Sequence, residues 1–333
     1  IVTWPGFVGA VSGMNEKGLT VTINAGKSSI PLKAKTPISI VTREILQYAS
    51  NVEEAIEVAQ KREVFVSEAI MVGSAQDKTA VLIEVSPKKF DVYRGESSAE
   101  LLVCSNHFQS EVYRSDEKNL KTIEESHSQY RFEKMNELVS ENPKITPEIA
   151  ADFSRNKEGL NDLKIGLGNE KSINQLLSHH AVIFQPEDRL MWVSANPYQL
   201  GAFVAYDLDE VFGEIENLKQ KERIWEEELV IAEDEFLHSE EFQNYLEFKK
   251  QLKIIVSKTN DKLPLNEINP QEFIQLNPDY WLSYAVIADN YFEQKKYTEA
   301  LENYKIALTK EITTLPDKER ILKRIQKCER KLK

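Results

Sequence analysis

Residues 8–26 read VGAVSGMNEKGLTVTINAG, and this stretch decides how the first part of the chain folds. Two runs of strand-forming residues flank a polar turn that ends at Gly18. Glycine adopts a positive φ without steric cost, and such a turn between two β-runs is typical of a hairpin. The sequence therefore predicts an antiparallel β-hairpin near the start of the chain.

The sequence beyond the hairpin alternates helical and strand patterns in blocks. Thr36 and Asn51 are the expected caps of two helices, and a second helical region spans residues 115–156. Short strand-like runs lie at residues 67–75, 79–86, 90–95, 101–108, 178–184, 189–196 and 203–208. Turns between consecutive runs are too short for crossover helices, so the strands are expected to pair antiparallel. The segregated blocks predict an α+β fold, with helices layered on antiparallel sheets.

The pattern changes near residue 213, where we place a domain boundary. Strand-like runs give way to charged stretches with helical spacing, beginning with residues 214–236. We therefore divide the chain into residues 1–212 and an all-α part, residues 213–333. Within the second part, residues from about 281 to 314 have the spacing of a tetratricopeptide repeat, at Tyr284, Ile287, Ala288, Tyr291, Ala300, Tyr304 and Ala307.

Charge and hydropathy exclude several classes of protein. The formal net charge is -12, from 54 acidic and 42 basic residues among 333. Phosphate binding needs clustered Lys and Arg, so no nucleic-acid partner is expected, and an anionic membrane surface is disfavoured for the same reason. No apolar run approaches the roughly 20 residues that span a bilayer, so no membrane-spanning segment is expected.

The stretch LLVCSNHFQS, residues 101–110, carries the first candidate chemistry. A cysteine nucleophile needs a base in contact with its sulfur, but strand alternation sends Cys104 and His107 to opposite faces. We therefore interpret Cys104 as a buried core thiol. Asn106 has two interpretations from the residues alone. It is either a structural Asx-turn residue, which is the default, or a fixed N–H donor in an oxyanion hole.

The remaining histidines, cysteines and glycines do not predict a metal or cofactor site. His179 and His180 are adjacent, so on a strand their side chains point apart, and we expect one to face a pocket and the other solvent. The two cysteines lie in different expected domains, which argues against a disulfide and a metal cluster. The lone glycine pair within residues 166–168 lacks a preceding strand and a phosphate-loop lysine, so no nucleotide cofactor is expected.

Taken together, the motifs resemble the acyl-coenzyme A:6-aminopenicillanic acid acyltransferase-like family of N-terminal-nucleophile hydrolases. The family's glycine-punctuated hairpin is similar to WPGFVGAVSGMNEKGLTVTINA, residues 4–25. Its Arg-containing helix and the helix start that follows are similar to REILQYASNVEEAIEVAQK, residues 43–61. Its Asn-His strand and closing hairpin are similar to CSNHF, residues 104–108, and HHAVIFQPEDRLMWVSANP, residues 179–197. The resemblance extends in order over residues 1 to about 210.

The resemblance implies a four-layer αββα sandwich and a precursor that cleaves itself to expose an N-terminal Cys. In such enzymes the new α-amino group is the base, the thiolate attacks an amide or thioester carbonyl, and the Asn of the Asn-His motif stabilises the oxyanion. By position, Asn106 is that donor. The loop at residues 159–171 is expected to shape the pocket. We assign His107, His180, Arg155 and Trp4 to the substrate pocket, with Arg155 available to pair with an acid or a substrate carboxylate, and Asn15 and Asn24 to structural support.

The chain departs from the family at its start, because Ile1 has no nucleophilic side chain and Thr3 lies too close to the hairpin to replace one. We therefore expect the C-terminal part of a longer acyltransferase or amide hydrolase, inactive alone, that acts on a small acyl-amide or acyl-thioester. The sandwich would lack its first strands. The alternative is a catalytically silent scaffold whose helical repeat binds a protein or peptide. The compartment, bacterial cytoplasm or cell envelope, stays open because the expected targeting end is not in the sequence.

Overall fold

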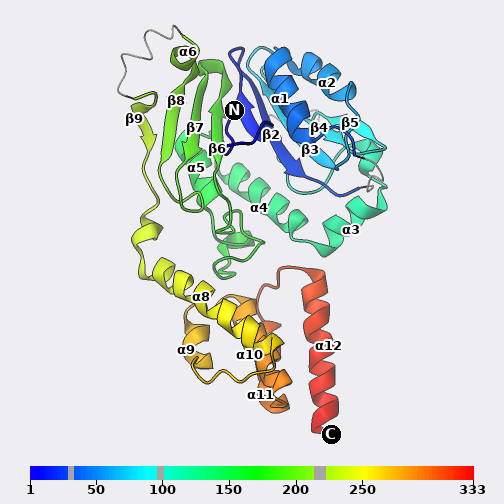
Figure 1. Ribbon diagram of the computed structural model, residues 1–333, viewed down its shortest axis with the longest axis vertical. Helices are drawn as coiled ribbons and strands as arrows, with labels where there is room; N and C mark the ends of the chain where they lie inside the picture. The colour runs from blue at the N-terminus through cyan, green and yellow to red at the C-terminus, as the bar shows by residue number, and fades with distance from the viewer. Residues whose placement is uncertain (29–33, 96–100, 214–222) are drawn as a thin grey trace.

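The structure, a computed structural model, describes residues 1–28, 34–95, 101–213 and 223–333. Two antiparallel sheets dominate its first part (Figure 1). The first sheet has the order β1-β2-β3-β4-β5 and consists of Ser12–Met14, Leu19–Ala25, Glu68–Ser74, Thr79–Val85 and Phe90–Tyr93. The second has the order β6-β7-β8-β9 and consists of Val182–Gln185, Leu190–Ser194, Phe203–Asp207 and Glu226–Ile231. This confirms the expected mixed class with antiparallel sheets.

The predicted hairpin is formed by β1 and β2, and Asn15 organises its turn. The side-chain oxygen of Asn15 accepts hydrogen bonds from the backbone N–H groups of Lys17 and Leu19, both at 3.0 Å. Gly18 has a φ of 72°, as the turn requires. The Nδ2 of Asn15 donates to the Leu46 and Ala49 carbonyls at 3.2 and 2.8 Å. This residue therefore shapes the turn and also binds it to the end of the first helix.

Helices cover one face of each sheet. α1 (Ile38–Tyr48) and α2 (Val52–Gln60) bury apolar residues of β2, β3 and β4. Asn51 caps α2, as predicted, by accepting a hydrogen bond from the Glu54 N–H at 3.0 Å. α5 (Pro147–Arg155) packs on the second sheet through Ala151. Because the hydrophobic face of each sheet must be covered, these helices supply the outer layers of the fold.

The uncovered faces of the two sheets meet at β1. Met14 packs against Met191 and the partly buried Phe184 and Tyr206 of the second sheet. The preceding residue, Gly13, has its opposite side against Leu46 of α1, so Met14 lies on the face of the first sheet away from α1. Met191, Phe184 and Tyr206 lie on the opposite face of the second sheet from the side chains that contact α5. At this contact the order of layers is therefore helix, sheet, sheet, helix.

Two of the expected elements differ from the prediction. Residues 101–110 form no strand, because their backbone is bound by side chains instead of by a neighbouring strand. Residues 226–231, expected to be helical, form β9 and pair with β8, with Phe203 opposite Ile231. The predicted helix over residues 214–236 is thus wrong at β9, and residues 214–222 lie outside the described residues. The second sheet extends beyond the boundary predicted at residue 213.

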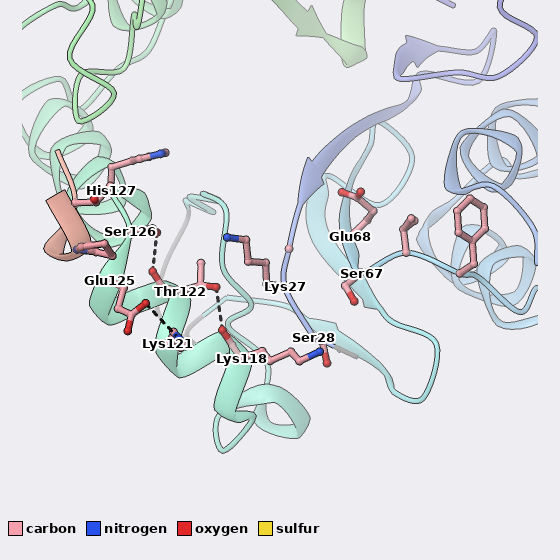
Figure 2. A pocket seen from close by; sticks show the side chains of 15 residues that line it. Lys27, Ser28, Ser67, Glu68, Lys118, Lys121, Thr122, Glu125, Ser126 and His127 are labelled. Atoms are coloured by element: carbon pink, nitrogen blue, oxygen red, sulfur yellow. Dashed lines mark hydrogen bonds and ion pairs between the residues drawn. The ribbon is translucent and has the colours of Figure 1, made fainter. Parts of the chain in front are cut away.

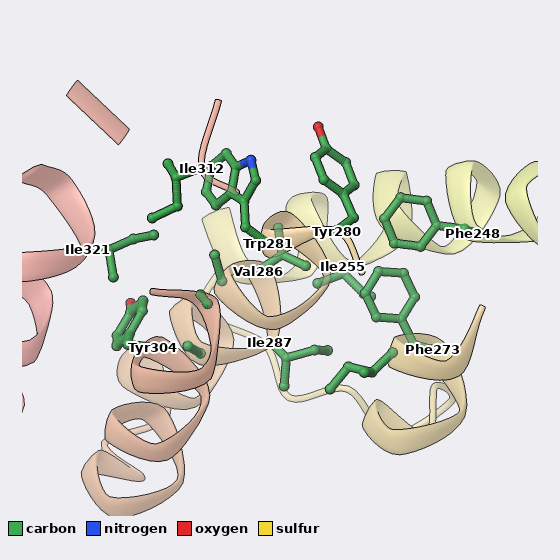
Figure 3. Close-up of a cluster of buried hydrophobic side chains, with 14 of the residues drawn as sticks. Phe248, Ile255, Phe273, Tyr280, Trp281, Val286, Ile287, Tyr304, Ile312 and Ile321 are labelled. Atoms are coloured by element: carbon green, nitrogen blue, oxygen red, sulfur yellow. The ribbon is translucent and has the colours of Figure 1, made fainter. Parts of the chain in front are cut away.

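A separate helical part follows β9, as Figure 1 shows. Its helices pack around one apolar core that includes the stacked rings of Phe248 and Phe273, with centroids 4.9 Å apart (Figure 3). Ala300 and Tyr304 are fully buried in the same core. None of the described helices combines the length and apolar character needed to cross a membrane. The helices are α8 (Glu240–Asn260), α9 (Pro270–Gln275), α10 (Trp281–Glu293), α11 (Tyr297–Ala307) and α12 (Leu315–Leu332).

Candidate functional site

The segment that carries Asn106 is held by buried side chains on both sides. The carboxylate of Glu84, on β4 and fully buried, accepts hydrogen bonds from the N–H groups of Gln109 and Ser110 at 2.7 and 2.9 Å. Burial raises the pKa of Glu84, although these hydrogen bonds oppose the rise. Asn119 binds the Phe108 backbone twice, accepting from its N–H at 2.8 Å and donating to its carbonyl at 3.0 Å. These bonds replace a strand ladder and fix the segment without a neighbouring strand.

The side-chain amide of Asn106 has a defined orientation. Its Nδ2 donates to the carbonyl of Ala25, the last residue of β2, at 3.1 Å. Its Oδ1 accepts from Nη2 of Arg131 at 2.6 Å. Since Arg131 can only donate, the oxygen of the amide must face it, and the nitrogen must face Ala25. One N–H of the amide donates to Ala25, and no second acceptor for this amide is found among the residues that the structure describes.

His127 holds Arg131 from the other side. His127 is the first residue before α4 (Ser128–Glu141), and Arg131 lies one turn into that helix. The Nε and Nη2 of Arg131 lie 3.3 and 3.1 Å from Nδ1 of His127, which must therefore be the accepting nitrogen. The Nε2 of His127 lies 3.3 Å from a carboxylate oxygen of Glu170, so it is the protonated nitrogen. Both neighbours thus select the same neutral tautomer.

The charges around His127 favour its neutral form. Burial, followed by the positive charges of Arg131, Lys27 and Lys171, lowers the pKa of His127 to about 4. Burial also lowers the pKa of Arg131, and the Glu170 carboxylate opposes that change. At neutral pH the group therefore consists of a neutral imidazole between a guanidinium and a carboxylate.

Cys104 is not placed to act as a nucleophile. Its Sγ donates to the backbone carbonyl of Ser105 at 3.4 Å and packs against a cluster that contains Ala69 and Phe108. Burial, followed by the negative charge of Glu84, raises the pKa of the thiol to about 12, although a hydrogen bond with Asn24 opposes the rise. Because the thiolate is the nucleophilic form, the thiol at this position is unreactive.

A cavity of about 790 Å³ reaches one member of this group, and Asn106, Arg131 and Glu170 are not among its lining residues. His127 lines it, as does Gly26, which follows the residue that accepts the Asn106 hydrogen bond. Figure 2 shows Ser67 and Glu68 on the β3 side and the residues of α3 (Glu117–Glu125) facing them. Burial raises the pKa of Glu68 to about 7. The other lining residues are Lys27, Ser28, Phe65, Val66, Lys118, Lys121, Thr122, Glu125, Ser126, Thr314 and Pro316.

His107 does not line this cavity. It is buried, with 5% of its surface exposed, and its Nδ1 lies 2.8 Å from the Ser128 hydroxyl. Its ring packs edge-on against Phe132, with centroids 5.4 Å apart. Burial, followed by the charge of Arg131, lowers the pKa of His107. This histidine is a core residue that binds the start of α4.

Arg155 also has a structural role in place of the predicted pocket role. Its guanidinium donates to three backbone carbonyls, those of Gln199, Gly201 and Ala232, at 3.4, 3.0 and 2.6 Å. The group also lies 5.2 Å from the centre of the Phe203 ring. With 8% of its surface exposed, this side chain is almost completely buried, and its partners are backbone carbonyls and no carboxylate among the residues that the structure describes.

The structure does not bring Trp4 and His180 to the cavity. Trp4 is 52% exposed and packs its ring on Phe7, with centroids 4.4 Å apart. His180 is half-buried just before β6, and burial, followed by the charge of His179, lowers its pKa. Neither residue is among those that line the 790 Å³ cavity. The predicted roles of both in a substrate pocket therefore stay predictions.

Three residues of the site were not predicted: His127, Arg131 and Glu170. His127 and Arg131 are four residues apart at the start of a helix, and that spacing places their side chains together. The sequence thus contained a signal for this pair. Glu170 had none, because only the tertiary fold brings its loop to α4. No group of three or more His, Cys, Asp or Glu side chains is placed to hold a metal ion within the described ranges.

Comparison with known proteins identifies the family. The family model described as "AAT: Acyl-coenzyme A:6-aminopenicillanic acid acyl-transferase" matches residues 3–197, which is more than half of the chain. The chain belongs to this family. The resemblance predicted from the sequence motifs is thereby confirmed. The matched residues include Asn106, His127, Arg131 and Glu170, whereas the whole helical part lies outside the match.

One solved structure with some similarity is a variant of conjugated bile acid hydrolase from Clostridium perfringens. The sequences are 11% identical, and the TM-score is 0.28. The alignment covers 63% of this chain and 73% of the hydrolase chain. Among curated proteins, no sequence matches this chain.

Proposed function

We propose that this chain builds the acyl-transfer site of an acyltransferase or amide hydrolase of the N-terminal-nucleophile type, with Asn106 as the oxyanion donor. The observation that carries the proposal is the fixed orientation of the Asn106 amide, with its oxygen on Arg131 and its nitrogen on Ala25. Membership of an acyltransferase family supports it.

The chemistry follows from that orientation. When a nucleophile attacks an amide or thioester carbonyl, negative charge develops on the carbonyl oxygen. The remaining N–H of the Asn106 amide donates to that oxygen. The guanidinium of Arg131, on Oδ1, draws electron density through the amide and strengthens the donor. Because both partners hold the amide in place, little reorganisation is needed during the reaction.

The nucleophile is proposed to come from outside these residues. The cysteine nearest Asn106 in sequence, Cys104, has a buried thiol with a pKa of about 12, so it cannot provide a thiolate at neutral pH. We propose an N-terminal Cys, exposed by self-cleavage of a longer precursor, whose α-amino group serves as the base. On this proposal the present chain alone is inactive. No cofactor is required, since attack, proton transfer and oxyanion stabilisation all come from protein groups.

The proposed substrate is a small acyl-amide or acyl-thioester that enters the cavity beside His127. Its walls combine the apolar side chains of Phe65 and Val66 with the amino groups of Lys27, Lys118 and Lys121. Such walls suit an apolar acyl group joined to a polar or anionic portion.

The proposed division of the chain follows from the two cores. The sandwich is proposed to extend through β9, and the helical part to begin at α8. The hairpin of α10 and α11 is proposed to be a tetratricopeptide-like repeat, with buried Ala300 and Tyr304 at its contact. Thr314, whose side chain accepts from the Asp317 N–H, then caps α12.

The test begins with the protein encoded by the complete reading frame. Mass spectrometry of the purified protein is expected to show a new N-terminal Cys. Turnover is measured with chromogenic small-acyl p-nitroanilides and with acyl-coenzyme A thioesters. Asn106→Ala is expected to lower kcat by about 100-fold to 1,000-fold with little change in KM, the usual effect of removing one oxyanion donor.

The control is Asn303→Ala, which removes an amide that binds the Glu299 carbonyl of its own helix, α11. It is expected to keep wild-type kcat. Unchanged kcat in Asn106→Ala would refute the oxyanion role. Full activity in residues 1–333 alone would refute the external nucleophile. Absence of turnover with every substrate, together with an unprocessed N-terminus, would favour the silent scaffold.

A further inference from the structure

The loop of residues 159–177 is inserted into the helical part. Leu167 and Leu176, from this loop, are buried in the same core as the helices. The side chain of Asn277 binds the backbone of Leu167 twice, accepting from its N–H at 3.1 Å and donating to its carbonyl at 2.9 Å. The loop is thus bound to the helical part by apolar contacts and by paired hydrogen bonds.

Two glycines allow this close contact. Gly166 has a φ of 84°, and a Cβ at this position would lie 2.4 Å from the Tyr280 backbone. Gly168 has a φ of 79°, and its Cβ would lie 2.9 Å from the Tyr245 hydroxyl. Any other residue would be strained in its φ and would push the loop away from the helices. The glycine pair therefore serves the contact between the two parts.

Asn169 completes the attachment through a buried polar network. Its Nδ2 donates to the Glu311 carbonyl at 2.9 Å, and its Oδ1 accepts from the Thr313 hydroxyl at 3.0 Å. Thr313 is in turn bound by the indole N–H of Trp281 at 2.9 Å. Lys171 adds an ion pair with the Glu311 carboxylate at 2.5 Å. Fully bonded buried networks of this kind hold their members in one arrangement.

Glu170 lies between these two anchored residues and contacts the N-cap of α4. Its carboxylate contacts His127 at 3.3 Å, whereas Asn169 and Lys171 on either side bind the segment before α12. The same segment contributes Thr314 to the cavity wall. The helical part is therefore linked to the candidate site in two ways. It holds the loop that carries Glu170, and it contributes Thr314 to the cavity wall.

We propose that the helical part is a positioning element of the acyl-transfer site, acting on Asn106 through Glu170, His127 and Arg131. The helices hold Asn169 and with it Glu170. Glu170 selects the tautomer in which His127 accepts from Arg131, and Arg131 fixes the Asn106 amide. The effect of these contacts on catalysis rests on the proposed function. The contacts themselves do not depend on that proposal.

The test observes the Asn106 amide directly. The chain of 333 residues is labelled with ¹⁵N-asparagine, and the side-chain cross-peaks of Asn106 are assigned by their loss in Asn106→Asp. His127→Ala, which removes the direct partner of Arg131, gives the reference displacement. Asn169→Ala is expected to move the same cross-peaks in the same direction. Asn303→Ala, in the same helical part, is expected to leave them in place.

Unmoved Asn106 cross-peaks in a folded Asn169→Ala protein would overturn the proposal. Should Asn169→Ala fail to fold, the half-exposed Glu170 decides instead. Glu170→Gln keeps an acceptor for His127 and is expected to resemble the wild type, whereas Glu170→Ala is expected to move the cross-peaks. Equal spectra for Glu170→Ala and the wild type would refute the proposal.

The two proposals fail in different ways, because the spectra need no catalysis. In a protein with measurable turnover, Glu170→Ala is expected to lower kcat by up to about 100-fold without raising KM, with rescue by Glu170→Gln. A spectral effect without any turnover would contradict only the proposed function. Turnover that is lost in Asn106→Ala but kept in Glu170→Ala would contradict only the positioning role.

Discussion

Two arginines on neighbouring helices show how differently one residue type can be used in this fold. Arg155, at the end of α5, donates to three backbone carbonyls and lies against the Phe203 ring. Arg131, in the first turns of α4, contacts two side chains, His127 and Asn106. Backbone carbonyls stay in place as long as the fold does, so the first arginine stabilises the fold. Side chains can rotate, so the second determines which way they point.

The largest expected effect is that of Arg155→Ala on stability. The variant leaves three carbonyls without their charged donor and opens a space beside Phe203, so the free energy of unfolding is expected to fall by about 3 to 5 kcal/mol. Urea denaturation measures it. The control is Arg114→Ala, which removes a 75% exposed side chain paired with Glu111 and is expected to change the free energy by less than about 0.5 kcal/mol. A loss no larger than that of the control would show that the carbonyl contacts do not stabilise the fold.

Arg131→Ala is expected to have a smaller effect on stability, about 2 kcal/mol or less. Burial already disfavours the charged form of Arg131, as its lowered pKa indicates, so removing the charge recovers part of the lost hydrogen-bond energy. Urea denaturation under the same conditions measures the difference from Arg155→Ala. Arg131→Lys keeps a charge but lacks the planar fork that reaches both His127 and Asn106, and it is expected to resemble Arg131→Ala. Equal losses for Arg131→Ala and Arg155→Ala would remove the distinction between the two arginines.

The sequence predicted the local elements and the family better than it predicted the site. The hairpin turn at Asn15 and Gly18 and the cap at Asn51 are set by neighbours a few residues away, and the structure contains all of them. The carbonyl partners of Arg155 come from residues 44, 46 and 77 positions away. Spacing in the sequence carries no information about such partners. The pocket role predicted for Arg155 came instead from the resemblance to the acyltransferase family.

The two wrongly predicted elements have the same cause. Residues 101–108 have the apolar run of a strand, but Glu84 and Asn119 bind this segment through side chains that no periodicity reveals. β9 begins with an acidic run that looks like a solvated helix face, yet it pairs with β8, since pairing with another strand outweighed local propensity. Asn106 could be named as a candidate because its motif is local, whereas Glu170 could not be named because its contact with His127 depends on the tertiary fold.

The smallest expected effect tests whether His127 is neutral in the folded protein. Glu170, Arg131, Lys27 and Lys171 face this histidine, and burial with the positive charges lowers its pKa from 6.5 to about 4. A lowered folded-state pKa means that His127 contributes stability above pH 6.5, and this contribution is lost as the pH falls toward 4, because the unfolded chain binds the proton first. Between pH 7.5 and 5.5 the wild type is expected to lose about 1 kcal/mol more than His127→Gln, which cannot titrate. Urea denaturation at both pH values gives the difference, and every other titrating group, including the buried His107, is shared by the two proteins. Parallel losses would mean that His127 accepts a proton in the folded protein, and Nδ1 would then no longer be free to accept from Arg131.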